Sequence, residues 1–319
     1  METMMAIRLQ DYGGPESLVY ESAPRPTPGD HEILVRVRAA GVNPVDWKFC
    51  AGWMRERLLV DLPVVPGLDL SGTVVAVGRL ARNWRVGDEV FGRTSLGGHG
   101  AFAEYAVAPA DAFARKPPHL DHVHAAAIPT AGLTAWQALF GQEGANRGLE
   151  PAPGRRILVH GGAGGVGSFA VQLAKWKGAQ VLVTGRAENG PFLRGLGADV
   201  VIDRESARFE DIAGVVDAVL DLVGGETLDR SLQVLSRGGA IASAVGSPSV
   251  EQAAERGVRI VPLWARTVPA QLERLATLVG DKVLRVVVSE VLPLAHARRA
   301  LELSRGGQVR GKLVLEIGG

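Results

Sequence analysis

The strongest periodic pattern in the chain lies between residues 157 and 186. Three apolar residues at 157–159 precede a glycine-rich stretch, after which apolar residues recur at Val166, Phe169, Ala170 and Leu173. A second apolar run follows at 181–183. An apolar run, a glycine turn, a helical periodicity and another apolar run predict a strand, a turn, a helix and a parallel strand.

The glycines of this turn have the spacing of a dinucleotide-binding site. Gly162, Gly164 and Gly167 form a G-x-G-x-x-G pattern between the predicted strand and helix. The first glycine of such a turn permits the tight bend, the second lets a pyrophosphate approach the backbone, and the third lets the helix pack on the strand. The helix N-terminus also offers free N–H groups. A plain connecting turn is the alternative, and the flanking periodicities favour the dinucleotide site.

The end of the second predicted strand indicates which dinucleotide binds. An NAD site places Asp or Glu there for the ribose hydroxyls, whereas this chain reads Thr184-Gly185-Arg186, with no acid before Glu188. Because a guanidinium suits a 2′-phosphate, these residues favour NADPH over NADH. The alternative is that Arg186 is a solvated surface residue.

Apolar patterning divides the rest of the chain into two kinds of structure. Up to about residue 122, short apolar runs broken by Gly and Pro predict an all-β region, with strands at 7–9, 33–37, 72–77, 89–91 and 103–107. From about residue 123 the sequence becomes helical and then alternates, with further strands at 200–202, 218–222, 240–245 and 258–261. Six strands with helical crossovers predict an α/β fold with a doubly wound parallel sheet. The C-terminal segment, with helices at 272–279 and 295–303 and a strand at 312–317, is expected to return to the β domain.

Composition narrows the classes of function. The 319 residues are 46% hydrophobic and 22% charged, with a formal net charge of +1, which is typical of two soluble domains without a basic surface for nucleic acid or anionic membranes. Cys50 is the only cysteine, so an intramolecular disulfide and a multi-cysteine metal site are excluded. No apolar run has the length of a membrane span and the start lacks a leader pattern, so a cytoplasmic protein is expected.

A dehydrogenase stabilises the reacting oxygen with zinc, with a Tyr–Lys pair or with a hydrogen-bonding pocket. His119, His122 and His124 lie close together where helical sequence begins, and solvated residues at a helix start are preferred over zinc ligands as their interpretation. None of the three tyrosines has a lysine four residues later, which argues against a short-chain dehydrogenase. The hydrogen-bonding pocket remains.

Polar residues after a predicted strand of the β domain supply candidates for that pocket. Asn43, Asp46 and Lys48 place an amide, a carboxylate and an ammonium within six positions. Turn chemistry alone also explains Asn43-Pro44 and Asp46, so the structural and catalytic interpretations both stay open. Asp46 is expected to cap or orient its segment rather than to react.

Several motifs, taken in order along the chain, resemble one family. They are Gly41-Val42-Asn43-Pro44-Val45-Asp46, Pro66-Gly67-Leu68-Asp69-Leu70-Ser71-Gly72, Gly87-Asp88-Glu89-Val90-Phe91-Gly92, Ala131-Gly132-Leu133-Thr134-Ala135, Val159-His160-Gly161-Gly162-Ala163-Gly164-Gly165-Val166-Gly167 and Gly311-Lys312-Leu313-Val314-Leu315. Together they resemble the zinc-independent quinone oxidoreductases, the zeta-crystallin-like branch of the medium-chain dehydrogenase/reductase superfamily. The resemblance covers nearly the whole chain and is more specific for the family than for the substrate.

This resemblance implies a GroES-like catalytic domain at 1–122 and 266–319 and a Rossmann dinucleotide-binding domain at 123–265, with the active site in the cleft between them. Zinc-dependent relatives carry Cys where Asn43 stands and His-Glu where Leu68-Asp69 stand, so no metal is expected. Asn43 is implied to lie beside the nicotinamide. The implied cofactor-binding set is Asn43, Thr130, Gly162, Gly164, Gly165, Val166, Thr184, Arg186, Ala244, Val245 and Gly246.

The chain also departs from the pattern of the quinone reductases. Tyrosines often follow the Asn in that branch, and Lys48 and Met54 stand at the corresponding positions here. Lys48 resembles the enone-reducing members, in which Asn-Pro-Val-Asp is followed by an aromatic residue and Lys. The expected reaction is hydride transfer from NADPH to a quinone or an α,β-unsaturated carbonyl (enone), with Asn43 and Lys48 as catalytic residues that stabilise the enolate oxygen. A surface position is the alternative for Lys48.

Two other functions stay open. A trans-acting enoyl-thioester reductase would prefer enoyl thioesters over free enones. A low-turnover NADPH-binding protein is suggested by crystallin-like and RNA-associating members of the family, although the balanced charge argues against nucleic acid. The apolar stretch at 258–264 is a candidate edge strand, and the resemblance implies a homodimer through this edge of the Rossmann sheet.

Overall fold

The computed structural model describes residues 2–142 and 146–318. Contacts divide the chain into two compact units. The first comprises Met1–Thr130, Thr267–Lys282 and Val286–Gly319, and the second comprises Ala131–Arg266 and Val283–Arg285. Residues 123–130, which the sequence prediction assigns to the Rossmann domain, group by contact with the first unit, because helix α2 (His122–Ala126) packs against strands of that unit.

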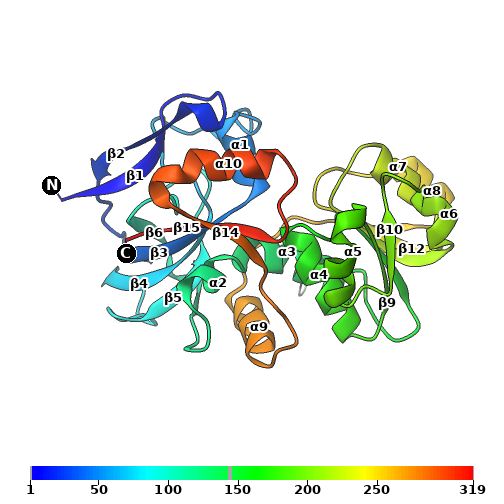
Figure 1. Cartoon of the computed structure of the whole chain (residues 1–319). Helices are drawn as coiled ribbons and strands as arrows, with labels where there is room; N and C mark the ends of the chain where they lie inside the picture. The colour runs from blue at the N-terminus through cyan, green and yellow to red at the C-terminus, as the bar shows by residue number, and fades with distance from the viewer. Residues whose placement is uncertain (1, 143–145, 319) are drawn as a thin grey trace. The chain divides into compact units, whose positions relative to one another are not determined.

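The second unit is built on a six-stranded parallel sheet, which confirms the predicted fold class (Figure 1). The four inner strands each hold a run of buried apolar residues, as expected for strands covered on both faces, whereas the edge strands β10 and β13 each bury a single apolar residue. In chain order the strands are β8 (Arg156–His160), β9 (Gln180–Gly185), β10 (Val200–Asp203), β11 (Val216–Asp221), β12 (Leu235–Ser243) and β13 (Arg259–Val261). The helices between them are α4 (Gly165–Trp176), α5 (Gly190–Gly195), α6 (Phe209–Ala213), α7 (Glu226–Ser231) and α8 (Val250–Glu255).

The strand order fixes where this sheet can bind a ligand. Across the sheet the order is β10-β9-β8-β11-β12-β13, so the direction of winding reverses between β8 and β11. The connections that follow these two strands go to opposite faces and leave a crevice outside their carboxyl ends. The turn after β8 and the loop after β11 meet at this edge, since a Cβ built on Gly161 would lie 3.4 Å from the Val223 side chain.

The first unit is β-rich and is closed by the C-terminal segment. A two-stranded sheet pairs β1 (Thr3–Leu9) with β2 (Leu18–Pro24). A seven-stranded sheet has the order β14-β15-β3-β4-β5-β7, with β6 also paired to β3. Its strands are β3 (Glu32–Val42), β4 (Asp69–Val77), β5 (Glu89–Arg93), β6 (Tyr105–Pro109), β7 (Phe113–Arg115), β14 (Val288–Pro293) and β15 (Lys312–Glu316).

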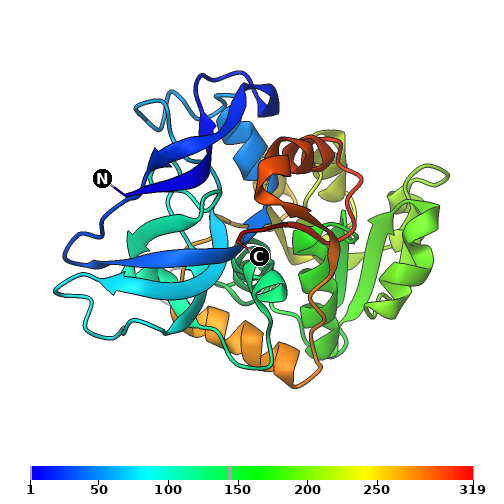
Figure 2. The same cartoon turned by 60° about the vertical axis from the view of Figure 1, so that its left-hand side comes forward.

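The predicted return of the C-terminal segment to the β domain is confirmed. Strand β15, red in Figures 1 and 2, lies antiparallel beside the blue β3, with Leu313 opposite Val42. Helix α10 (Ala297–Arg305) packs on α1 (Pro44–Cys50), and α9 (Pro269–Gly280) packs near β7. Helix α3 (Pro129–Phe140) begins at the end of the first unit.

The Asn-Pro motif joins two regular elements. Strand β3 continues to Val42 and α1 begins at Pro44, so the residues for which the sequence analysis considered turn chemistry lie at the end of a strand and the start of a helix. Proline suits the first helical position because its missing N–H has no partner there in any helix. Strands β2 and β14 escaped prediction because polar residues, among them Glu21 and Glu290, interrupt their apolar runs. Within the described residues, no helix is long and apolar enough to cross a membrane.

The glycine turn after β8 is held by close backbone packing. Gly161 has a φ of 75°, so the tight bend lies at Gly161 and not at Gly162, to which the sequence analysis assigned it. Gly162 is needed for another reason, because a Cβ on it would overlap Val183 Cγ1 of β9. A Cβ on Gly167 would overlap the Gly161 carbonyl oxygen, in agreement with its predicted role in packing helix on strand.

A Gly162→Ala substitution is expected to lower the free energy of unfolding by about 1–3 kcal/mol, because the added methyl group must displace Val183 in a packed sheet. Gly195→Ala is the matched control, since a Cβ there meets nothing within 4 Å and Gly195 lies in α5. Urea unfolding followed by circular dichroism measures both. Equal stability of the two variants would contradict the packing argument.

Candidate cofactor and polar sites

The N-terminus of α4 has the properties of an anion site. The first N–H groups of an α-helix have no acceptor within the helix, and here they belong to the turn at the carboxyl end of β8. A Cβ on Gly164 would meet only the Gly161 carbonyl oxygen, 3.6 Å away, so the space beside Gly164 is open. The predicted residues Gly164, Gly165 and Val166 therefore fit the pyrophosphate of a dinucleotide.

The Thr184 hydroxyl has a partner inside the sheet. It lies 3.0 Å from Nδ1 of His160, which stands opposite Thr184 in the β8–β9 register. Ser231 donates its hydroxyl proton to the Thr227 carbonyl and lies 3.0 Å from His160 Nε2, so Nε2–H donates to Ser231 and the Thr184 hydroxyl donates to Nδ1. Burial lowers the pKa of His160 to about 4, which keeps the imidazole neutral. The predicted contact of Thr184 with the adenosine phosphate stays a prediction.

Arg186 lies at the carboxyl edge of the sheet, immediately after β9. Its Nε is 3.3 Å from Oε1 of Glu205, which follows the neighbouring strand β10. The Arg186 side chain is 28% exposed, and its Nε is shielded from solvent without a hydrogen bond. The sequence predicted Arg186 at this site, but the acid beside it is 19 positions away in the chain and was missed.

A polar network orders the segment that was predicted to border the nicotinamide. The buried Asp221, at the end of β11, accepts a hydrogen bond from the Ser243 hydroxyl at 2.7 Å. The Ser243 oxygen in turn accepts the N–H groups of Val245 (3.3 Å) and Gly246 (3.1 Å). Asp221 and Ser243 stand opposite each other in the β11–β12 register, so the two strand ends fix the turn at 244–246.

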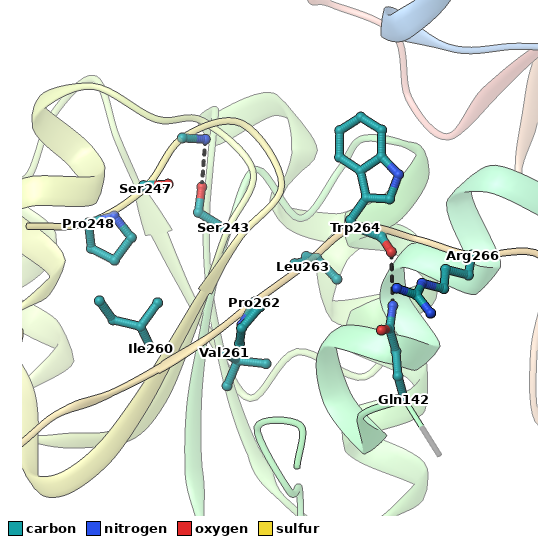
Figure 3. A pocket seen from close by; sticks show the side chains of 11 residues that line it. Gln142, Ser243, Ser247, Pro248, Ile260, Val261, Pro262, Leu263, Trp264 and Arg266 are labelled. Carbon is teal, nitrogen blue, oxygen red and sulfur yellow. Dashed lines mark hydrogen bonds between the residues drawn. The ribbon is translucent and has the colours of Figure 1, made fainter. Parts of the chain in front are cut away.

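A cavity of about 390 Å³ lies beside this turn. Figure 3 shows Ser247, Pro248 and Ile260 around it, with the Trp264 indole projecting from the segment after β13. The Trp264 carbonyl accepts a hydrogen bond from Gln142 Nε2 at 2.8 Å. Of the residues predicted to bind the cofactor, Gly246 lines this cavity.

The Asn43 amide in the first unit is fully engaged with its own fold. Its Nδ2 donates to Asp69 Oδ2 at 3.0 Å and, at 3.5 Å, to the Gly41 carbonyl, and its Oδ1 accepts a hydrogen bond from Lys312 Nζ. Asn43 is only 3% exposed. The sequence predicted Asn43 as a donor to substrate, and these hydrogen bonds support a positioning role at the start of α1.

Lys312 and Asp69 form the centre of this buried cluster. Lys312 Nζ also donates to the Val42 carbonyl at 2.7 Å and lies 3.8 Å from Asp69 Oδ2. Burial lowers the pKa of Lys312, and the Asp69 carboxylate opposes this effect by favouring the ammonium form. Asp69 receives the Thr130 N–H (3.0 Å) and hydroxyl (2.5 Å) as well, so the predicted residues Asn43 and Thr130 meet at one carboxylate.

Asp46 caps α1 as the sequence analysis expected. Its Oδ2 accepts the Asn43 N–H at 2.7 Å, whereas its Oδ1 is buried without a hydrogen-bond partner. The side chain is fully buried, and this desolvation raises the pKa of Asp46 to about 7 against the opposing effect of the Asn43 hydrogen bond.

Lys48, the other predicted catalytic residue, follows one half-turn after Asp46. Its Nζ lies 5.7 Å from the ring of Trp47 and 5.4 Å from the ring of Trp53, which make an edge-to-face pair 5.2 Å apart. Both distances lie within the range of a cation–π contact. The Trp53 ring belongs to a residue that is 67% exposed.

The donor groups of the buried cluster around Asp69 are already engaged with other residues of the fold. Asn43 and Asp69 already bind an ammonium, and a cation in their midst repels a metal. His119 and His122 have separate partners, the Ala276 carbonyl (3.1 Å) and the Ser71 hydroxyl (2.8 Å). Over residues 2–142 and 146–318, no three His, Cys, Asp or Glu side chains come together as a metal site.

Lys312 and Asp221 are site residues that the sequence analysis did not single out. A charged residue within the apolar run of β15 was the available signal for Lys312, because a buried lysine needs a partner. No local pattern marks Asp221, since its role depends on the neighbouring strand.

An Asp46→Asn substitution tests the buried carboxyl. The folded protein keeps the Asp46 proton up to about pH 7 while the unfolded chain releases it near pH 4, so the stability that Asp46 contributes is lost as the pH rises through this window. The amide oxygen of Asn can still cap the Asn43 N–H. From about pH 5 to about pH 8, the free energy of unfolding of the variant should gain about 2–3 kcal/mol relative to the parent. Urea unfolding at both pH values measures this change, and Asp281→Asn, at an exposed position, is the control. A difference in free energy of unfolding between variant and parent that does not depend on pH would contradict the prediction.

Comparison with known proteins identifies the family. The family model of the alcohol dehydrogenase GroES-like domain matches residues 29–118, and that of the zinc-binding dehydrogenases matches residues 196–315. The chain is 34% identical over 326 residues to the chloroplast envelope quinone oxidoreductase homolog of Arabidopsis thaliana, with 98% of each chain covered. It is 36% identical over 253 residues to the NADPH-dependent alkenal/one oxidoreductase of the same organism, covering 76% of this chain and 63% of the relative.

Solved structures agree with this relationship. The quinone oxidoreductase from Coxiella burnetii has a TM-score of 0.90 and 35% identity, covering 99% of this chain and 100% of that one. The Escherichia coli quinone oxidoreductase complexed with NADPH has a TM-score of 0.87 and 28% identity, covering 98% and 99%. The chain belongs to the quinone oxidoreductase branch of the medium-chain dehydrogenase/reductase superfamily and is an NAD(P)H-dependent oxidoreductase.

Proposed function

We propose that this protein is an NADPH-dependent reductase of quinones or enones that works without zinc. The observation that carries the proposal is the buried cluster of the first unit, in which the Lys312 ammonium binds Asn43 and lies beside Asp69. In such a cluster Asn43 and Asp69 are already engaged with a cation and are not free to bind a metal. Reduction of a polarised C=C or C=O group needs hydride and a hydrogen-bond donor, and it needs no Lewis acid to ionise an alcohol.

Several features support NADPH as the cofactor. The open turn beside Gly164 and the N-terminus of α4 suit a pyrophosphate, and Arg186 supplies a guanidinium at the end of β9. The alkenal/one oxidoreductase of Arabidopsis is named as NADPH-dependent, and the structure of the Escherichia coli quinone oxidoreductase was solved with NADPH. The turn at 244–246, ordered by Ser243, is proposed to border the nicotinamide.

Separate roles in the reaction are proposed for the chain's own residues. Bound NADPH supplies the hydride. The ammonium of Lys48 is proposed to donate a hydrogen bond, and finally a proton, to the oxygen that becomes negative. Asn43 is proposed to hold the start of α1 through Asp69 and Lys312, so that Lys48 keeps its place one turn further along. The predicted contact between Asn43 and the nicotinamide stays a prediction.

The first test is turnover of purified protein with NADPH in the presence of a zinc chelator. Loss of reduced-nicotinamide absorbance with a small para-quinone or a short-chain enone supports the proposal, and the ratio of the two rates identifies the better substrate class. Binding of NADPH without turnover of either compound contradicts it. The enoyl-thioester reductase is then tested with enoyl thioesters, and the low-turnover binding protein is what remains if they too are not reduced.

A Lys48→Met substitution is expected to lower kcat about 10²-fold or more with a smaller change in KM, because a donor to the developing charge acts in the transition state. Lys177→Met is the matched control, since Lys177 Nζ also lies over an indole, 3.9 Å from the Trp176 ring centroid, but on the far end of α4. Steady-state kinetics with the better substrate measures both variants. Unchanged kcat in Lys48→Met would remove Lys48 from the mechanism.

A homodimer through the edge of the Rossmann sheet is also proposed. Strand β13 ends the sheet order, and the segment that follows it exposes Trp264 to 75%. An apolar edge strand offers unpaired backbone groups to a second copy of the chain. A mass in solution of twice 33.6 kDa is expected, and a monomeric mass would contradict it.

A further inference from the structure

The ends of two neighbouring parallel strands bring opposite charges together. In the β9–β10 register Gly185 stands opposite Asp203, so Arg186 and Glu205 emerge from the same edge of the sheet. Arg186 Nε and Glu205 Oε1 are 3.3 Å apart. Within the described residues, Glu205 is the acid that forms an ion pair with Arg186.

The position of Glu205 is built by the turn that follows β10. The Arg204 N–H donates to the Gly185 carbonyl at 2.9 Å, which ties this turn to the end of β9. Asp203 then accepts the Glu205 N–H at 3.1 Å and the Ser206 hydroxyl at 2.6 Å. The backbone of Glu205 is therefore held beside Arg186, while its side chain, 63% exposed, can still turn toward solvent.

We propose that Glu205 is a specificity-determining residue that competes with the 2′-phosphate of the cofactor for Arg186. This inference rests on the proposed role of Arg186 in binding NADPH. A phosphate monoester carries between one and two negative charges at neutral pH, so Glu205 repels it and also pairs with Nε of the guanidinium that would bind it. The phosphate must therefore compete with the carboxylate for Arg186.

The same geometry lets Glu205 act in the opposite sense on a ligand without the phosphate. A carboxylate near the adenosine ribose can accept hydrogen bonds from free hydroxyl groups, as acids do in NAD sites. Glu205 therefore reduces the difference in affinity between adenosine ligands with and without a 2′-phosphate. Because the ion pair is partly exposed, replacing the carboxylate by a ligand anion costs little free energy.

The test uses Glu205→Gln, Arg186→Gln, the double variant and the parent. Isothermal titration calorimetry measures the Kd of adenosine 2′,5′-bisphosphate and of adenosine 5′-monophosphate for each. Glu226→Gln is the control, because it removes the same charge at the start of α7, which follows β11, and β8 separates β11 from β9 in the sheet. None of these substitutions changes a residue whose side chain is buried.

For Glu205→Gln, the Kd of the bisphosphate should fall about three- to fivefold, a change of the size that exposed ion pairs produce. The monophosphate should bind with equal or lower affinity, and the gain should vanish in the Arg186→Gln background. An unchanged or higher Kd for the bisphosphate overturns the proposal, because Glu205 then orients Arg186 and does not compete with the ligand. An equal gain in Glu226→Gln, or with the monophosphate, overturns it too, since the effect is then one of net charge.

The proposed NADPH preference and the proposed competition at Arg186 can fail separately. If the parent and Glu205→Gln both bind the two ligands equally, the proposed NADPH preference fails and competition at Arg186 fails with it. If the parent binds both ligands equally and Glu205→Gln prefers the bisphosphate, the competition at Arg186 is supported. The proposed NADPH preference of the natural protein then fails. A parent that prefers the bisphosphate, with no effect of Glu205→Gln, supports NADPH and overturns the competition.

Discussion

The buried ammonium of Lys312 is the constraint on which the first unit depends. A charge out of contact with water is tolerated only when opposite charge and hydrogen bonds surround it. Lys312 comes from the last strand of the chain, and its partners come from the end of β3, from Asn43 at the start of α1 and from Asp69 at the start of β4. Asp69 also receives Thr130 at the start of α3. Five elements are therefore held together by one pair of charges, and the C-terminal strand is part of the candidate site as well as of the sheet.

The second unit obtains its geometry differently, from the close approach of backbones. Gly162 and Gly167 allow β8, β9 and α4 to pack within distances that a Cβ would prevent. Gly164 has open space beside it, so the same turn that packs tightly on one side can approach a ligand on the other. The polar groups of this unit that are buried, such as His160 and Asp221, bind neighbouring strands and loops and so keep the carboxyl edge in one conformation.

The sequence predicted the elements whose signals are local. The helical recurrence after the glycines predicted α4, and the apolar runs predicted the six parallel strands, because these patterns repeat within a few residues. Lys312 was missed as a partner of Asn43 because 269 positions separate them. The pairing of Thr184 with His160 was missed for a related reason, since it follows from the register of two strands and not from either segment alone. Asp46 was predicted as a cap because its spacing from Asn43 is local, but its complete burial depends on the strands around it.

Two of the ion pairs in this chain illustrate opposite uses of charge. Lys312 and Asp69 are almost completely buried, so separating them would leave an uncompensated charge in a medium of low polarity, and they hold one arrangement. Arg186 and Glu205 lie at a partly exposed edge, where water and salt weaken their attraction. The buried pair is suited to positioning catalytic groups because it does not exchange. The exposed pair suits the proposed competition for the reverse reason, because in it an incoming anion would replace Glu205 while Arg186 remains in place.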